Sequence, residues 1–158
     1  MASPSATATA SRSQIGANVV TLAGVGLVGY GLLFLYRNFN GFIELGLTPA
    51  QVGGTPEQIQ GFSMNLYHYI SHLQVAVSAF IMALGVAVIA LARYGIRSGH
   101  RWAVWTAFIT PVIGVGIALP PHYMWGFATM GHLGLIYGDA AILLVGTILA
   151  HRELSARG

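Results

Sequence analysis

The chain has 158 residues, of which 55% are hydrophobic and only 7% are charged. Soluble domains carry about 25% charged residues, so this chain has too few charges to cover a water-facing surface. It contains no cysteine, which excludes disulfides, thiolate catalysis and cysteine metal sites, and no lysine, which excludes a Schiff-base cofactor. The net charge of +3 is too small and too scattered for a nucleic-acid partner. We therefore expect an integral membrane protein whose first partner is the lipid bilayer.

Four apolar stretches predict an all-α fold, a bundle of four transmembrane helices. The spans are expected at about 15–36, 63–93, 102–119 and 132–150, and each is long enough to cross a hydrocarbon core. Pro120 and Pro121 are expected to end the third span. Residues 1–14 are rich in Ser, Ala and Thr and are expected to form a disordered polar tail. The four-span domain would thus cover residues 15–151, and residues 152–158 would form a second tail.

The longest connection, residues 37–62, contains two similar helix starts. Thr48-Pro49-Ala50-Gln51 and Thr55-Pro56-Glu57-Gln58 each place Thr as N-cap, Pro at the first helical position and Gln three residues after the cap. Gly53 and Gly54 separate them. We expect a short interfacial helix, a break, and then a lead-in to the second span.

The arginines predict the orientation. Four spans put both termini on one side, together with all but one of the arginines, and only Arg37 lies opposite. Basic residues concentrate on the cytoplasmic side, so we expect both termini inside and the long connection outside. We expect a multi-pass protein of a bacterial or archaeal plasma membrane. In span number and in its long first external loop, the layout is similar to several families of small bacterial membrane proteins, the DoxX-like ones among them.

The start of the second span is unusually polar for a membrane helix. His68 and His72 lie four residues apart on one helix face that also includes Asn65. Tyr67 and Gln74 belong to an adjoining polar stripe. A polar half of a membrane helix must face protein, water or ligand, so the pattern predicts a cavity near the external face.

Asp139 is the only acid inside a span, and His132 precedes it by seven residues on the same helix face. An ionisable residue at membrane depth costs free energy to insert and is a candidate functional group. We expect His68, His72, His132 and Asp139 to line the cavity. The expected substrate-binding residues are Glu44, Asn65, Tyr67, Gln74, His122, Tyr123, Trp125 and Tyr137.

Three functional hypotheses follow. In the leading one, the pocket binds a lipophilic small molecule, with acid–base chemistry by His72 as base, Asp139 as partner acid and His132 as second donor. In the second, His68, His72 and His132 hold haem or a divalent metal in an electron-transfer or quinol-linked subunit. In the third, the chain is a non-catalytic accessory subunit of a larger membrane complex or a homo-oligomer. In the simplest interpretation the histidines are interfacial and Asp139 holds helices together.

Overall fold

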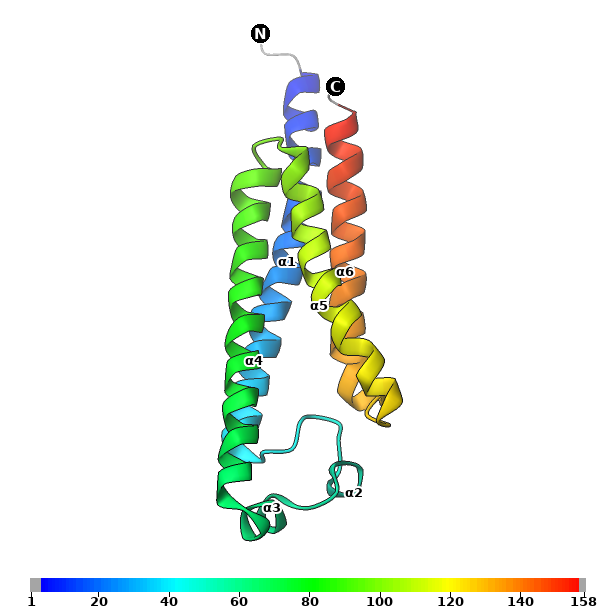
Figure 1. Ribbon diagram of the computed structural model, residues 1–158. Helices are drawn as coiled ribbons and strands as arrows, with labels where there is room; N and C mark the ends of the chain where they lie inside the picture. The colour runs from blue at the N-terminus through cyan, green and yellow to red at the C-terminus, as the bar shows by residue number, and fades with distance from the viewer. Residues whose placement is uncertain (1–3, 157–158) are drawn as a thin grey trace.

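The computed structural model describes the backbone of residues 4–156 and the side chains from residue 15 onward, and this part of the chain is helical without strands. The elements are α1 (Pro4–Asn40), α2 (Pro49–Val52), α3 (Pro56–Phe62), α4 (Met64–Ala90), the π-helical η1 (Leu91–Ile96), α5 (Arg101–Met124) and α6 (Met130–Ser155) (Figure 1). Four helical segments are long and apolar enough to cross a membrane, namely Ile15–Asn40, Met64–Ile96, Arg101–Met124 and Met130–Ser155. The all-helical class and the presence of four such helices are thereby confirmed.

Two boundaries differ from the sequence-based expectation. Helix α1 begins at Pro4, so residues 4–14 are helical where a disordered tail was expected, and residues 1–3 lie outside the described range. Helix α5 continues through Pro120 and Pro121 to Met124. Each proline lacks the N–H group that would make one helical hydrogen bond. This last turn tolerates the loss because it is partly exposed to solvent and is held by other hydrogen bonds. The Trp125 N–H donates to the Pro121 carbonyl over 2.9 Å, which closes the final turn.

The bundle is closed at one end and open at the other. Helix α1 packs against both α4 and α6, whereas α5 packs mainly against η1 and α6. Both ends of the described chain lie at the closed end, called here the terminal end (Figure 1). The α1–α4 pair and the α5–α6 pair diverge toward the other end, where the connection bearing α2 and α3 lies; this is the loop end.

Small residues allow the close packing around α1. A Cβ added at Gly85 of α4 would lie 2.7 Å from the Gly24 carbonyl oxygen of α1, and one at Gly146 of α6 would lie 2.8 Å from the Val20 nitrogen. The buried core, which includes Ala17, occupies the terminal half of the bundle. The core therefore holds the terminal ends of the helices together and leaves the loop ends free to separate.

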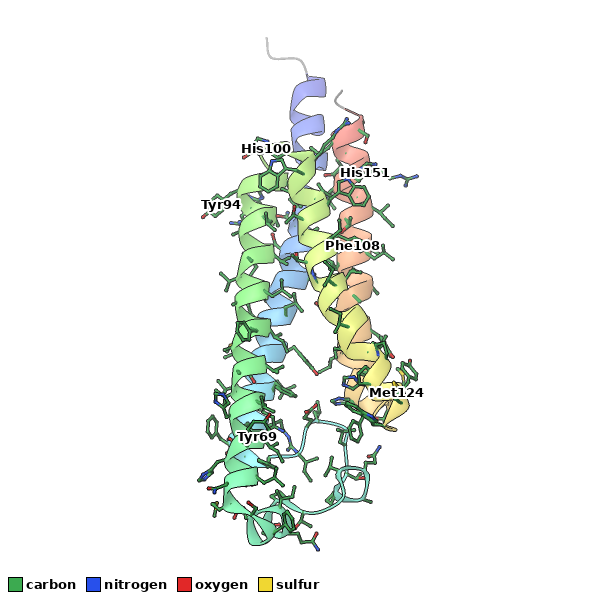
Figure 2. All side chains as sticks on the ribbon, viewed as in Figure 1. Tyr69, Tyr94, His100, Phe108, Met124 and His151 are labelled. Carbon is green, nitrogen blue, oxygen red and sulfur yellow. The ribbon has the colours of Figure 1, made fainter. Side chains whose placement is uncertain are left out.

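Charged and aromatic side chains mark the two ends of the long helices. At the terminal end, Arg97 donates to the Asn18 side chain over 2.6 Å, and Arg101 donates to the Leu154 carbonyl over 3.3 Å. Figure 2 shows Tyr94 and His100 at this end, and Tyr69 toward the other. Exposed aromatic rings at both ends of apolar helices suit the two interfaces of a membrane.

Candidate functional site

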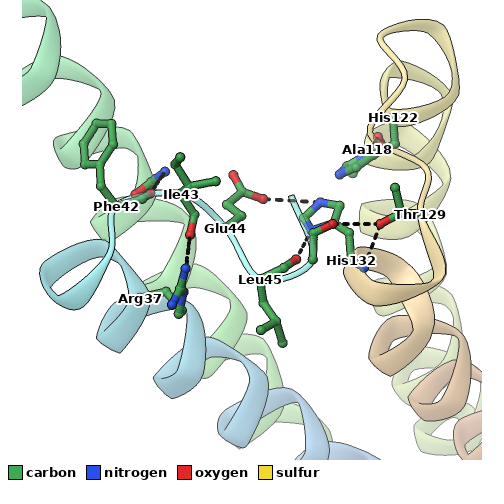
Figure 3. Close-up of polar contacts among 11 residues, drawn as sticks. Arg37, Phe42, Ile43, Glu44, Leu45, Ala118, His122, Thr129 and His132 are labelled. Atoms are coloured by element: carbon green, nitrogen blue, oxygen red, sulfur yellow. Dashed lines mark hydrogen bonds and ion pairs between the residues drawn. The ribbon is translucent and has the colours of Figure 1, made fainter. Parts of the chain in front are cut away.

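The connection after α1 is fixed to the bundle by its first residues. The Arg37 guanidinium donates from Nε and Nη2 to the Ile43 carbonyl, over 3.3 and 2.9 Å (Figure 3). Gln74 of α4 donates from Nε2 to the Phe42 carbonyl over 3.0 Å, and the Phe42 ring stacks on Tyr67 with centroids 4.1 Å apart. Phe42 has φ 64, a conformation that bulky residues rarely adopt. These contacts hold that turn and direct the following residues toward α6.

The same connection then docks on the first turn of α6. Gly46 has φ 79 and lies so close to Gly131 that a Cβ at Gly46 would overlap the Gly131 backbone. Thr129 donates to the Gly46 carbonyl over 3.0 Å, and its hydroxyl also accepts from the His132 N–H at the start of α6. Glu44 and Leu45 are thus brought beside His132, across the opening between the two helix pairs.

Beyond Gly46, both expected helix starts are confirmed. Helix α2 begins after Thr48, whose N–H donates to the Gln51 side chain over 3.0 Å. Helix α3 begins after Thr55, with reciprocal bonds of 2.8 and 3.2 Å between Thr55 and Gln58. These two helices cover the loop end of the bundle (Figure 1).

His132 and Glu44 form a pair across this junction (Figure 3). His132 is only 3% exposed, and its Nδ1 lies 2.9 Å from the Leu45 carbonyl oxygen. Since a carbonyl only accepts, the hydrogen-bond network assigns a proton to Nδ1. Nε2 then faces the Glu44 carboxylate, with 3.3 Å between Nε2 and Oε2, and has no other partner in the described part of the chain. The separation fits an ion pair, and no hydrogen bond is formed between the two groups.

This arrangement places one exchangeable proton between two groups. If Nδ1 is protonated, a further proton can sit on His132 Nε2 or on the Glu44 carboxyl, and one of these must hold it to avoid two lone pairs facing each other. Burial raises the pKa of Glu44, while the nearby His132 and His122 partly offset that rise. The His122 ring centroid lies 5.1 Å from that of His132, and its Nδ1 is 2.7 Å from the Ala118 carbonyl. Glu44 and His132 are therefore close enough to share a proton.

The pair lies on the wall of a cavity of about 450 Å³, called here the loop-end cavity. Its polar lining comes from Glu44, Gln74, His122 and His132. The rest of the wall is apolar and comes from the connection, α3, α4 and the segment after α5, as in Ile43, Leu47, Ile59, Ile70, Trp125 and Phe127. An apolar cavity with a few convergent polar groups is typical of a small-molecule site.

The structure brings together only some of the residues expected at the site. Glu44, Gln74, His122, Trp125 and His132 line the loop-end cavity. Tyr67 packs beneath it against Phe42. Tyr123 and Tyr137 share a 2.7 Å hydrogen bond between their hydroxyls, but neither lines the cavity.

His68, His72 and Asn65 are exposed on α4, and none of them lines the cavity. The structure thus does not assemble His72, His132 and Asp139 into one acid–base group. The reason lies in the adjoining stripe of α4, which faces the protein instead. Ser78 is fully buried, and Ser71 accepts a 3.0 Å hydrogen bond from Asn38 of α1, so the histidine face is turned away. Asp139 lines a different cavity, between α1, α5 and α6.

The geometry also bears on the haem and metal hypothesis. Among the described residues there is no group of three or more His, Asp and Glu side chains arranged to hold a metal ion. His72 is exposed and His132 is buried against Glu44, so these two do not face a common space as axial ligands would.

Comparison of the chain with protein-family models, with curated proteins and with solved structures gives no match.

Proposed function

We propose that this chain is an integral membrane protein that binds a lipophilic small molecule with a hydroxyl or carbonyl group in the loop-end cavity. The four apolar helices support insertion, and the concentration of arginines at the terminal end supports an orientation with both termini in the cytoplasm. The loop-end cavity would then open at the outer face of a bacterial or archaeal plasma membrane, where a lipophilic molecule can enter from either water or lipid.

The observation that carries the proposal is the Glu44–His132 pair on an otherwise largely apolar wall. A ligand hydroxyl would donate to the Glu44 carboxylate, and a ligand carbonyl would accept from the protonated pair. The apolar wall would hold the rest of the molecule by burying its surface. Glu44 thus takes the role of base that the sequence pattern gave to His72, with His132 as its proton partner and His122 as a second donor.

The experiment is a comparison of two probes that differ in one hydroxyl. Equilibrium dialysis of the detergent-solubilised protein would measure the affinities of naphthol and naphthalene, each corrected for its uptake by protein-free micelles. The wild type should prefer naphthol by about tenfold or more, because a hydrogen bond to a charged group contributes about 1.5–3 kcal/mol. Glu44→Gln should weaken that preference, because a neutral amide oxygen accepts more weakly than a carboxylate, whereas Glu57→Gln, at an exposed carboxylate in α3, should retain it.

Equal affinity of the wild type for the two probes, or an unchanged preference in Glu44→Gln, would contradict the proposal. If neither probe binds and the chain instead co-purifies with other membrane proteins in a fixed ratio, the accessory-subunit hypothesis would be favoured.

A further inference from the structure

A second cavity lies between α1, α5 and α6, in the middle of three apolar helices, and is called here the mid-span cavity. Its volume is about 620 Å³. Glycines on all three helices provide much of this space, because each lacks a side chain that would fill it: Gly26, Gly29, Gly116, Gly134 and Gly138. At Gly29, Gly116 and Gly138 an added Cβ would meet nothing within 4 Å, so these positions border open space.

Of the described residues that line the mid-span cavity, Asp139 is the only acidic or basic one. It starts from α6 and reaches the backbone of α1, where a Cβ at Gly26 would overlap its carboxyl oxygen. Within the described residues no hydrogen bond or ion pair to this carboxyl is formed. Asp139 lies nine residues after Met130, the first residue of α6, which places it about 14 Å along the helix from the loop end.

A carboxylate in an apolar environment is costly unless a cation pairs with it. Among the described residues, no arginine or histidine lines the mid-span cavity, so a cation that pairs with the Asp139 carboxylate would be an external ligand. The apolar wall excludes a small hydrated ion, because too few oxygen ligands are present to replace its water. The wall does suit a cation that carries its own apolar groups, and Tyr30 and Phe108 add aromatic rings that attract such a cation.

We propose that the mid-span cavity binds a lipophilic organic cation, with the Asp139 carboxylate as its counter-ion. The glycine positions make room for the apolar body of the ligand, and the carboxylate selects its charge. This site differs from the loop-end cavity in its helices, its lining and its ligand class, and it does not depend on the Glu44–His132 pair.

The test uses two probes of the same shape and opposite charge. Binding of tetraphenylphosphonium and of tetraphenylborate would be measured on the purified chain in a non-ionic detergent, with empty micelles as reference. The wild type should bind the cation in a saturable manner, at one site per chain, and should bind the anion no better than empty micelles do. Asp139→Asn, which keeps the size of the side chain, should weaken binding of the cation by about tenfold or more.

A pair of glycine variants tests the location independently of the charge. Gly116→Leu would fill part of the mid-span cavity, whereas Gly114→Leu makes the same change on the same helix at a position that borders open space but does not line the cavity. Cation binding should fall by about tenfold or more in Gly116→Leu, from loss of the space the ligand occupies, and should stay unchanged in Gly114→Leu.

Equal binding of the two probes by the wild type, or full cation affinity in Asp139→Asn, would overturn the proposal. It would also be overturned if the folded wild type does not bind the cation, including the case in which a basic side chain of another membrane helix occupies the cavity.

Discussion

Gly85 offers a direct test of the close packing of α4 against α1. A Cβ at this position would lie 2.7 Å from the Gly24 carbonyl oxygen and 2.8 Å from the Val28 nitrogen, whereas ordinary contact begins at about 3.4 Å. Both obstacles are backbone atoms of α1, which cannot rotate away as a side chain could. The Gly85→Ala substitution should therefore push α4 away from α1.

The expected loss of stability follows from two opposing effects. Overpacking a close contact destabilises the folded state by about 1–3 kcal/mol. Replacing glycine by alanine inside a helix stabilises it by about 0.5–1 kcal/mol. We expect Gly85→Ala to lower the free energy of unfolding by about 1–2 kcal/mol. Gly114→Ala is the matched control, because its Cβ meets nothing within 4 Å, and it should be as stable as the wild type or slightly more stable.

Unfolding in mixed micelles with increasing sodium dodecyl sulfate, followed by far-ultraviolet circular dichroism, would measure both variants. A Gly85→Ala protein as stable as the Gly114→Ala protein would show that α1 and α4 do not approach as closely as described, and would refute the packing argument.

Three further predictions concern the site and the topology. Burial raises the pKa of Glu44 in the folded state. The protonated Glu44 side chain therefore stabilises the folded protein below its unfolded-state pKa of about 4.3, and this stabilisation is lost as the pH rises through its folded-state pKa. The stability of the wild type relative to Glu44→Gln should therefore fall with rising pH in that window, and a constant difference would contradict it. Gly46→Ala should release the connection from α6, because φ 79 and the Gly131 backbone both exclude a Cβ. Proteolysis between residues 41 and 55 should then be faster than in the wild type, and an unchanged rate would contradict this prediction. The chain has no cysteine, so Ala50→Cys and Ala156→Cys, both exposed, can each be labelled alone. In intact cells an impermeant maleimide should react with Ala50→Cys only, and the reverse pattern would invert the proposed orientation.

The helices were predictable because the signals that form them are local. Long apolar stretches with few charges define the four main helices, and the two Thr-Pro-x-Gln segments define the starts of α2 and α3. The continuation of α5 past Pro121 was not predictable from proline alone. There the helix continues because the Pro121 carbonyl accepts from Trp125 at the exposed end, which sequence rules for helix interiors do not consider.

The composition of the site was predictable only in part, because it depends on contacts distant in sequence. His132, Glu44 and His122 were expected near one another, and the structure places them on one cavity wall. His72, which the sequence pattern placed beside His132, lies on the exposed side of α4 in the structure. Two adjacent polar stripes on α4 could each have faced inward. The stripe that does so is fixed by two hydrogen bonds, from Asn38 of α1 to Ser71 and from Gln74 to the Phe42 carbonyl.

Nothing in the sequence indicated the crossing of Gly46 with Gly131. It requires φ 79 at one glycine and close backbone contact at the other, and neither differs in sequence from the many other glycines of the chain. This crossing brings Leu45 and Glu44 to His132, so the site could not have been derived without the path of the connection.

The most direct test of the central claim is to locate a bound probe by tryptophan quenching. Trp125 lines the loop-end cavity, whereas Trp102 lies in the first turn of α5 at the terminal end. Proteins with only one of these tryptophans, the others replaced by Phe, would be titrated with bromonaphthol, whose bromine quenches tryptophan on contact. We predict saturable quenching of Trp125 at one probe per chain, weakened in Glu44→Gln, and only weak, non-saturating quenching of Trp102. Equal and non-saturating quenching of both tryptophans would show that the probe merely dissolves in the micelle and would contradict a specific site at Glu44 and His132.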